Sequence, residues 1–300
     1  MTPDSTGPFP GPPPFPHGSP RPAPFSPDDL TVVVPVRDDP LIYRCLASVD
    51  LPCPVVVSTN GSPSWFLEGL TAYAKAVPRV TVLSAPESGI GLAYNHAIEH
   101  AVTPLVLLMD SDCVFEPGAV AAMLAEASHG LVKGRVRFET SGRGSRLVAA
   151  ARRLTEDPLV TKKVNAYSPP LLYRTDIVDR MGGYHFDTAM KWREDRDFEL
   201  RRRRSGLPVR LVPEAVVWHK PLSVRDDLRS VRAYGAGQAH GESLKLLPAM
   251  SLPHEVRKAV TVVRRGARRG EVAAGLYAAL RNLVVVASRG TALRRRRGAK

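Results

Sequence analysis

Four short runs of β-branched and aliphatic residues, separated by segments of helical length, constrain the fold of this chain most strongly. The runs are 31–36, 54–58, 80–83 and 105–109. The first of them lacks polar alternation, which is typical of a strand buried on both faces. The segments between the runs are helical in pattern at about 40–49, 64–76 and 89–102. Strands that alternate with helices at this spacing predict right-handed crossovers and a mostly parallel sheet with helices on both faces.

The second half of the chain has a more mixed pattern. A helix is predicted over about 117–128, a strand over 131–138 and a loop at 141–145, where glycine and arginine follow one another. The remaining predictions are a strand at 171–173, a helix at about 193–204, extended segments at 209–212 and 215–218, and helices after Pro221.

Proline content divides the chain. Residues 1–27 contain eleven prolines, a composition that cannot bury enough apolar surface to offset the entropy of ordering. We therefore expect a disordered leader at 1–28, an α/β domain at 29–222 and a helical, basic extension at 223–300. Ligands bind such α/β sheets at the carboxyl ends of the strands.

Two carboxylates follow the most apolar strand. They belong to Met109-Asp110-Ser111-Asp112, and in a turning segment residues two apart can point the same way. Paired carboxylates suit Mg²⁺ or Mn²⁺, which prefer oxygen ligands and can bridge a diphosphate. The plainer interpretation is a turn or a helix cap, since Asp and Ser are favoured in both. The residues alone leave these two interpretations about equally supported.

Several further motifs occur around this pair in a fixed order. They are Val33-Val-Pro35-Val36, Ser58-Thr-Asn-Gly-Ser62, Gly89-Ile-Gly-Leu-Ala93 with Asn95, Asp110-Ser-Asp112, Gly182-Gly183-Tyr184 and Glu194-Asp195-Arg196-Asp197-Phe198, with Arg201, Gly206, Pro213 and His219 after them. Together they resemble the family 2 glycosyltransferases, which have the GT-A fold. The resemblance runs from about Leu30 to Lys220 and makes 29–222 the expected catalytic domain.

The resemblance implies metal-dependent transfer of a sugar from a nucleotide-diphosphate sugar to an acceptor hydroxyl or similar nucleophile, with inversion at the anomeric carbon. The nucleotide-sugar-binding residues that it implies are Pro35, Val36, Arg37, Asp38, Asn60, Gly89, Asn95, Asp110, Ser111 and Asp112. The metal, Mg²⁺ or Mn²⁺, would bind Asp110, Asp112 and His219. Two departures concern the nucleotide: Thr59 stands where members often have Asp, and Arg37-Asp38 replaces the usual pair after the first strand.

The acidic segment at Glu194 carries the implied catalytic step. Inversion needs a base within hydrogen-bond reach of the acceptor nucleophile, and Asp195 matches the position of the family's base. Glu194 would bind the acceptor or tune that base, and the other implied acceptor-side residues are Trp192 and Gly183. The alternative is that these acids only begin a helix, where the macrodipole favours negative charge.

The basic charge is concentrated at the end of the chain. The net charge is +13, and residues 257–300 contain thirteen Lys or Arg but one acid, Glu271. Apolar stretches between these charges predict amphipathic helices, which either contact an anionic membrane or pack on the catalytic domain. The stretch 272–287 is too short, and too interrupted by Arg281 and Asn282, to span a bilayer. Nucleic-acid binding ranks third, because only Tyr277 offers a stacking aromatic.

Location and alternative functions complete the expectations. Three cysteines without metal-site spacing, and no signal-peptide pattern, predict the cytoplasm, with peripheral contact at the inner face of the membrane through 257–300 as one of the two interpretations of this segment. With either interpretation, the basic element of residues 257–300 is expected to be separable from the chemistry. One alternative function is a nucleotidyltransferase, which would usually have a basic, glycine-rich loop after the first strand. The other is a non-catalytic scaffold or binding protein anchored by its tail.

Overall fold

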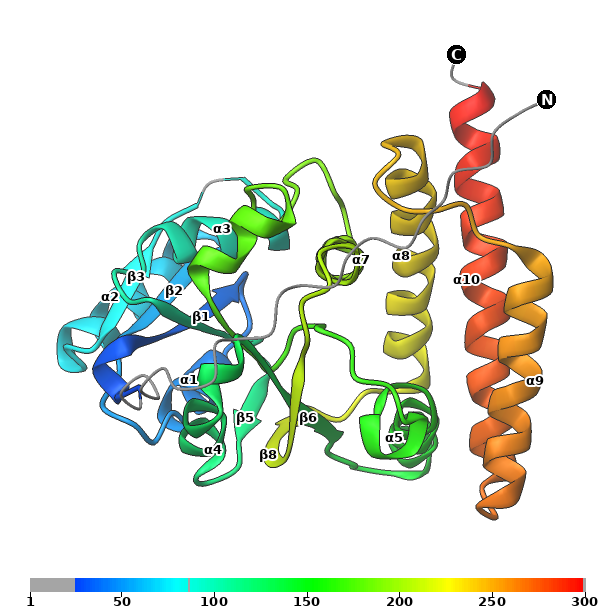
Figure 1. The fold of residues 1–300 in the computed structure, drawn as a ribbon, viewed down its shortest axis with the longest axis horizontal. Coiled ribbons are helices and arrows are strands. Elements are labelled where there is room, and N and C mark those ends of the chain that lie inside the picture. Colours follow the sequence, from blue (N-terminus) through cyan, green and yellow to red (C-terminus); the bar gives the residue numbers. More distant parts are fainter. Residues whose placement is uncertain (1–24, 86, 299–300) are drawn as a thin grey trace, which may run out of the picture.

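The structure is a computed structural model that describes residues 25–85 and 87–298. Most of the predicted leader, residues 1–24, lies outside the described residues. Figure 1 shows an α/β body built on one curled sheet, with long C-terminal helices standing beside it. The predicted fold class, an α/β sheet of the GT-A type with a C-terminal helical extension, is confirmed.

One sheet of eight strands forms the centre of the body. The strands are β1 (Leu30–Val36), β2 (Val55–Thr59), β3 (Val80–Leu83), β4 (Leu105–Leu108), β5 (Cys113–Phe115), β6 (Leu131–Phe138), β7 (Leu171–Arg174) and β8 (Arg210–His219). Their order is β3-β2-β1-β4-β7-β6-β8-β5. Pairing is parallel in β3-β2-β1-β4 and between β6 and β8, whereas β7 is antiparallel to both its neighbours and β5 to β8. The sheet is therefore mixed, with its parallel half in the first part of the chain.

Helices cover the sheet and continue beyond it. They are α1 (Ile42–Ala47), α2 (Ser64–Ala76), α3 (Ile90–Glu99), α4 (Ala119–Ala125), α5 (Arg143–Glu156), α6 (Pro158–Thr161), α7 (Glu194–Arg204), α8 (Val224–Ser243), α9 (Leu252–Arg268) and α10 (Val272–Gly298). Short 3₁₀ segments lie at Pro27–Asp29, Ala127–His129 and Thr175–Met181.

The first strand shows why an unbroken apolar run was informative. Val32 and Val34 point into a core shared with α1, α2 and α4, whereas Val33 points into a second core shared with α3 and α7. All three valines are fully buried. Side chains of a strand alternate between the two faces, so a strand covered on both sides must be apolar at every position.

Three local predictions are wrong. The predicted loop at 141–145 contains the start of α5, and this helix was missed because five arginines and glycines dilute its apolar positions. The two extended segments after residue 209 are one strand, β8, which continues through Pro213. The short strand β5 was also missed, since only three residues separate the Asp110–Asp112 turn from the next turn.

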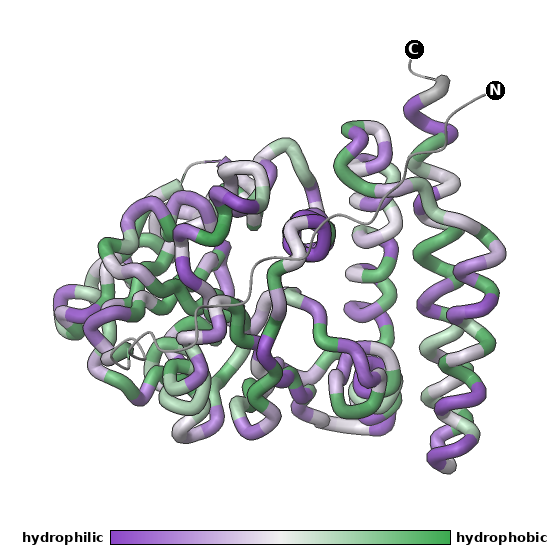
Figure 2. The backbone as a smooth tube through the Cα atoms, viewed as in Figure 1, coloured by the Kyte–Doolittle hydropathy of each residue, from purple (hydrophilic) through white to green (hydrophobic). Residues whose placement is uncertain are grey.

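The C-terminal helices pack on the body through α5. Val148, Ala151 and Leu154 of α5 form a third core with Val262 of α9 and with α10 residues Ala274, Tyr277 and Ala278. Figure 2 shows apolar segments along both helices of the α9–α10 hairpin. The basic segment is thus packed on the body, and whether its outer side also contacts a membrane is a separate question.

Among the described residues, one helix is long and apolar enough to cross a membrane by length and composition. It is α10 over Val272–Arg296, with 39% of its most apolar window buried inside the protein. The expectation that this segment is too short is wrong, because the helix continues past residue 287. A core helix of a soluble protein passes the same test, and Arg281 in α10 is buried in ion pairs with Asp227 and Glu156.

Candidate active site

Two strand ends bring the D-x-D carboxylates to the predicted edge of the sheet. Asp110 and Asp112 follow β4, and Arg37, Asp38 and Asp39 follow its parallel neighbour β1. β5 begins directly after Asp112 and pairs Cys113 with the last residue of β8, His219. Because of this antiparallel pairing, a residue more than a hundred positions away lies beside the D-x-D turn.

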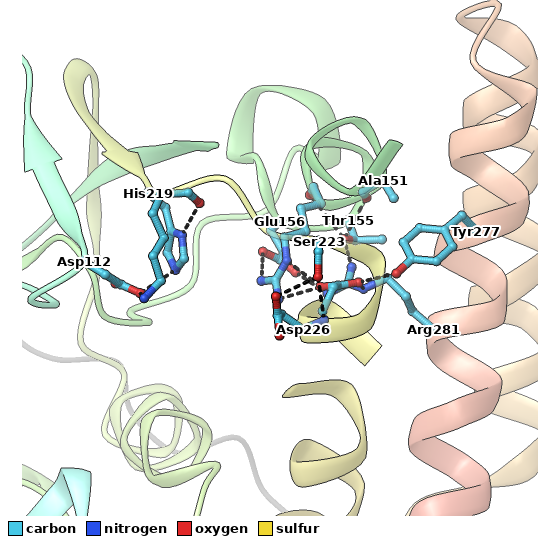
Figure 3. A network of polar contacts seen from close by, with 12 residues as sticks. Asp112, Ala151, Thr155, Glu156, His219, Ser223, Asp226, Tyr277 and Arg281 are labelled. Atoms are coloured by element: carbon cyan, nitrogen blue, oxygen red, sulfur yellow. Dashed lines mark hydrogen bonds and ion pairs between the residues drawn. The ribbon is translucent and has the colours of Figure 1, made fainter. Parts of the chain in front are cut away.

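The His219 side chain faces Asp112, as Figure 3 shows. Its Nε2 atom lies 3.4 Å from Asp112 Oδ2, and its Nδ1 atom lies 2.8 Å from the Lys220 carbonyl oxygen. Ligand atoms of Asp112, Cys113 and His219 all lie within 4.8 Å of one another. Carboxylate and imidazole ligands suit Mn²⁺, so these residues fit a divalent cation.

Lys220 adds a cation that the sequence did not point to. Its Nζ atom lies 2.5 Å from Asp39 Oδ2 and 3.3 Å from Asp112 Oδ2. The ammonium group therefore links the loop after β1 to the D-x-D turn and partly neutralises the carboxylate that a metal would use.

Asp110 is held differently from Asp112. The Tyr94 hydroxyl donates a hydrogen bond to Asp110 Oδ1 at 2.7 Å and lies 2.9 Å from Ser168 Oγ. Burial, and next the neighbouring Asp112 carboxylate, raise the pKa of Asp110 to about 6. A half-buried turn with two neighbouring carboxylates favours binding of a cation, which would relieve the repulsion between them.

The acidic segment lies at the first turn of α7. Trp192 and Arg193 both have left-handed backbones, with φ of 68° and 72°, and turn the chain into the helix at Glu194. Glu194 is 8% exposed, and its Oε2 atom is buried without a hydrogen-bond partner. Burial, and next the charge of Asp195, raise the pKa of Glu194 to about 8. Burial also raises the pKa of Asp195, although Arg193 and Arg196 oppose this.

Both carboxylate groups belong to one electrostatic environment. The negative charge of Asp195 contributes to the raised pKa of Asp110, and that of Asp110 contributes to the raised pKa of Glu194. Lys133 of β6 is a buried basic residue on which the charges of Asp110 and Asp195 both act. Burial lowers the pKa of Lys133 to about 7, against the pull of Asp110 and Asp195, and its Nζ donates to the carbonyl oxygens of Pro169 and Pro170 at 2.6 and 3.2 Å. The sequence around Lys133 contains no clear signal for its burial, because Arg135 and Arg137 follow it in the same strand.

Several predicted nucleotide-side residues support the loops around the site. Asn60 accepts a hydrogen bond from the Gly89 amide at 2.5 Å, and Asn95 both donates to and accepts from the Phe186 backbone, at 2.8 and 3.1 Å. Pro35 and Val36 are buried in β1, whereas the side chains of Arg37 and Asp38 are exposed and Ser111 is half-buried. The amide of Asn95 is therefore occupied by the loop before α7, which makes it a positioning residue in this structure.

Asp197, the remaining acidic residue of the segment, has a structural role. Arg201 forms an ion pair with Asp197 at 2.8 Å and donates to the carbonyl oxygens of Met181, Tyr184 and His185. Arg201 is 8% exposed and thus points inward from the arginine run at the end of α7. Gly183, with φ of 79°, lies in the loop that this arginine holds, and its own amide donates to Val178.

Helix α8, the first helix of the expected extension 223–300, holds the segment that carries Trp192. Trp192 is 47% exposed and packs edge-on against Tyr234 of α8, with ring centroids 5.6 Å apart. Gly237 lies so close that an added Cβ would be 2.8 Å from Lys191 O and from Trp192 Cβ and O. The α8 backbone thus supports the predicted acceptor side directly, whereas the separable element expected from charge counting, residues 257–300, begins after α8.

Gly237→Ala is expected to displace Trp192 and to lower the free energy of unfolding by about 1–3 kcal/mol, as overpacking does. Quenching of tryptophan fluorescence by acrylamide, together with urea unfolding, measures both effects. Gly290→Ala is the matched control, because an added Cβ there meets nothing within 4 Å. Equal quenching and equal urea midpoints in the two variants would contradict the tight contact between Gly237 and the Trp192 segment.

The stability of the protein is expected to respond to pH through Glu194. Its pKa is raised from 4.5 to about 8, so between these values the folded protein holds a proton that the unfolded chain has lost. Stability from this group is therefore lost as the pH rises through this window. We expect Glu194→Gln to raise the free energy of unfolding by on the order of 2 kcal/mol above pH 8 and to change it little near pH 4.

Urea midpoints at both pH values test this expectation. Glu199→Gln is a control of opposite sign on the same helix. The pKa of Glu199 is lowered despite its burial, because Arg202, the Ala166 amide and Arg203 bond to the carboxylate. That variant should destabilise the protein at neutral pH. Parallel pH profiles for wild type and Glu194→Gln would contradict the account of Glu194.

Comparisons with known proteins identify a family model and solved structures that this chain resembles. Residues 31–175 match the model of glycosyl transferase family 2. The mannosyltransferase PcManGT from Pyrobaculum calidifontis, solved with GDP-Man and Mn²⁺, is 19% identical with a TM-score of 0.54, over 92% of this chain and 78% of that one. S. aureus TarS 1-349, solved with UDP-GlcNAc, is 15% identical with a TM-score of 0.51, over 91% and 92%. At these identities the likeness shows the fold alone. A comparison with curated proteins finds no match.

Proposed function

Because residues 31–175 place this chain in glycosyltransferase family 2, we propose that it transfers a sugar from a nucleotide-diphosphate sugar to an acceptor hydroxyl or similar nucleophile, with inversion at the anomeric carbon. One observation carries this proposal: Asp112 and His219 lie at the strand ends, and the Glu194–Asp195 pair lies at the start of α7, with the charges of the two groups coupled through Asp110. Inverting transfer needs both a place for the diphosphate and a base for the acceptor.

A divalent cation, Mg²⁺ or Mn²⁺, would be held by Asp112 and His219, with Asp110 beside them. When bound, such an ion supplies charge stabilisation for the departing diphosphate. Support comes from the grouped ligand atoms and from the pKa of Asp110, which is raised mainly by burial and next by the neighbouring Asp112 carboxylate.

Lys220→Met is expected to strengthen binding of Mn²⁺ to the nucleotide-free protein by about tenfold, because the lysine cation competes for Asp112. Electron paramagnetic resonance of free Mn²⁺ measures the affinity without any turnover. Lys220→Arg keeps the charge and is expected to bind like the wild type. Unchanged or weaker binding by the methionine variant would show that Lys220 does not compete for this site.

Asp195 is the base in the proposed step. As the acceptor oxygen bonds to the anomeric carbon, the bond from that carbon to the diphosphate breaks, and the acceptor proton moves to the Asp195 carboxylate. Glu194, with a pKa of about 8, keeps its proton at neutral pH and can donate a hydrogen bond to the acceptor. The half-buried Asp195 is the one of the two that can accept a proton.

The environment of Thr59 concerns which nucleotide the donor carries, and the donor itself has to be identified by experiment. The Thr59 Oγ1 atom accepts a hydrogen bond from the Ala85 amide at 3.0 Å, and it is buried, so no carboxylate faces a base from this position. PcManGT was solved with GDP-Man and TarS with UDP-GlcNAc, and both donors therefore belong in a test panel.

The panel incubates the full chain with GDP- and UDP-sugars, among others, and Mn²⁺ or Mg²⁺, and measures the nucleoside diphosphate released. We expect release with one nucleotide class, and its loss on chelation. No release with any donor, by hydrolysis or transfer, would favour a non-catalytic scaffold. Pyrophosphate release from a nucleoside triphosphate instead would favour a nucleotidyltransferase.

We further propose a cytoplasmic location, with peripheral contact between residues 257–300 and the anionic inner face of the membrane. Support comes from the three free thiols, Cys45, Cys53 and Cys113, which are buried and unpaired, as is usual in a reducing compartment. The basic excess of the last 44 residues supports the contact itself.

A further inference from the structure

The α9–α10 hairpin has a row of exposed apolar side chains that no described part of the protein covers. They are Leu252, Val256 and Val260 of α9 and Val272, Leu276, Leu280 and Leu283 of α10, each 43–63% exposed. We call these seven side chains the outer face. Spacings of three and four residues align each set along one side of its helix.

Both rows lie on the same side of the hairpin. The two helices are antiparallel and meet where Asn282 donates to the Glu255 carbonyl oxygen, at 2.9 Å, and where Gly266 contacts Gly275. In each helix a residue of the outer face directly follows a residue of this contact, as Val256 follows Glu255 and Leu283 follows Asn282. The next residue of any α-helix is rotated by the same angle about the helix axis. Because these two helices run in opposite directions, that rotation turns both apolar rows to the same side of the hairpin. Buried Tyr277 and Ala278 point to the opposite side, into the third core.

Positive charge borders the outer face. Arg257, Arg264 and Arg268 are exposed along α9, and Arg294 and Arg295 are exposed near the end of α10. The two acids nearest to the face are already paired, Glu255 with Lys258 at 3.4 Å and Glu271 with Arg153. An apolar row bordered by arginines alone complements the anionic head groups and acyl chains of a membrane interface. A second copy of the hairpin would instead bring arginines toward arginines.

The polar residues of α10 exclude a spanning arrangement for the folded protein. Arg281 forms ion pairs with Asp227 at 2.9 Å and with Glu156 at 3.2 Å. Figure 3 shows Arg281 of α10 in the same network as Glu156. Moving α10 into a bilayer would break these pairs and empty the third core. The outer face can enter the head-group region without any such change.

We propose that the outer face of the α9–α10 hairpin lies in the interface of an anionic membrane, with both helices parallel to its surface. The inference deepens the proposed peripheral contact and rests on it, but it does not depend on the transfer reaction. It replaces a contact through the basic tail as a whole by one through seven apolar side chains, with the bordering arginines facing lipid head groups.

Sedimentation of the full chain with vesicles tests this surface. The probes are phosphatidylcholine vesicles and vesicles of an equal mixture of phosphatidylcholine and phosphatidylglycerol. We expect binding to the mixed vesicles, reduced by about tenfold or more in Leu276→Gln/Leu280→Gln/Leu283→Gln. The matched control is Trp65→Gln/Val102→Gln/Leu159→Gln, which changes three exposed apolar side chains elsewhere. Equal binding by the two triple variants would overturn the proposal.

A local probe reports insertion itself. All three native cysteines are buried, so Leu280→Cys provides one accessible thiol for an environment-sensitive dye. We expect a blue shift of its emission with the mixed vesicles and none with phosphatidylcholine alone. No shift with either would overturn the proposal, and so would a dimer in solution that dissociates in the outer-face variant. Release of nucleoside diphosphate without lipid should be unchanged in that variant, so failure of the surface and failure of the chemistry are distinguishable.

Discussion

Asp195→Asn is expected to lower the transfer rate by about 10³-fold, within the range that general bases contribute. The amide keeps the shape of the side chain but cannot take the acceptor proton. Burial raises the pKa of Asp195. As the pH is lowered, wild-type kcat should therefore begin to fall at a higher pH than it would if the base were an ordinary aspartate. Initial rates of nucleoside diphosphate release at saturating donor, measured across pH, test both statements.

Glu194→Gln is the matched control for this experiment. It removes a neighbouring carboxyl that is already protonated at neutral pH, so we expect a loss far smaller than that of Asp195→Asn. A larger loss of transfer rate in Glu194→Gln than in Asp195→Asn would identify Glu194 as the base. Near-normal turnover in Asp195→Asn would remove this residue from the catalytic step.

Asp227→Ala is expected to lower the free energy of unfolding by about 3–5 kcal/mol, because it leaves buried arginines without a counter-charge. Asp227 is fully buried and lies 2.8 Å from Arg152 Nη2 and 2.9 Å from Arg281 Nε. Its Oδ2 atom also accepts a hydrogen bond from the Tyr277 hydroxyl at 2.8 Å. One carboxylate therefore joins α5, α8 and α10, in the network drawn in Figure 3.

The neighbouring Asp226 provides the control. Its side chain is 49% exposed and bonds to Ser223 at the start of α8, so Asp226→Ala should lower the free energy of unfolding far less than Asp227→Ala does. Urea unfolding of both variants measures the difference. Equal midpoints would mean that the three helices do not depend on the buried carboxylate.

The parallel half of the sheet could be predicted from the sequence, because its strands are buried on both faces and therefore apolar throughout. The D-x-D turn followed from its place after β4, and α7 from its acids at the start and Gly206 at the end. These features are local: each depends on a few consecutive residues and on the period of a strand or helix.

Features that depend on distant contacts could not be predicted. Nothing near Lys220 in the sequence indicates that it pairs with Asp39 and Asp112, since β8 brings it there from far along the chain. In α5, Arg152 pairs with Asp227 and Arg153 with Glu271, both far along the chain, whereas the start of this helix resembles a loop by its sequence alone. Gly237 is needed only because the loop with Trp192 packs on α8. In each case a contact with a distant part of the chain, and not the neighbouring sequence, explains the residue type at that position.

The most direct test of a site with two parts is a donor titration of two variants beside the wild type. With the donor identified by the panel, affinity in the presence of Mn²⁺ is measured by calorimetry, and turnover is measured on the same preparations. We predict that Asp112→Asn loses both donor affinity and turnover, whereas Asp195→Asn keeps the affinity and loses the turnover. Equal loss of donor affinity in both variants would contradict the division of the site into a diphosphate part and a base.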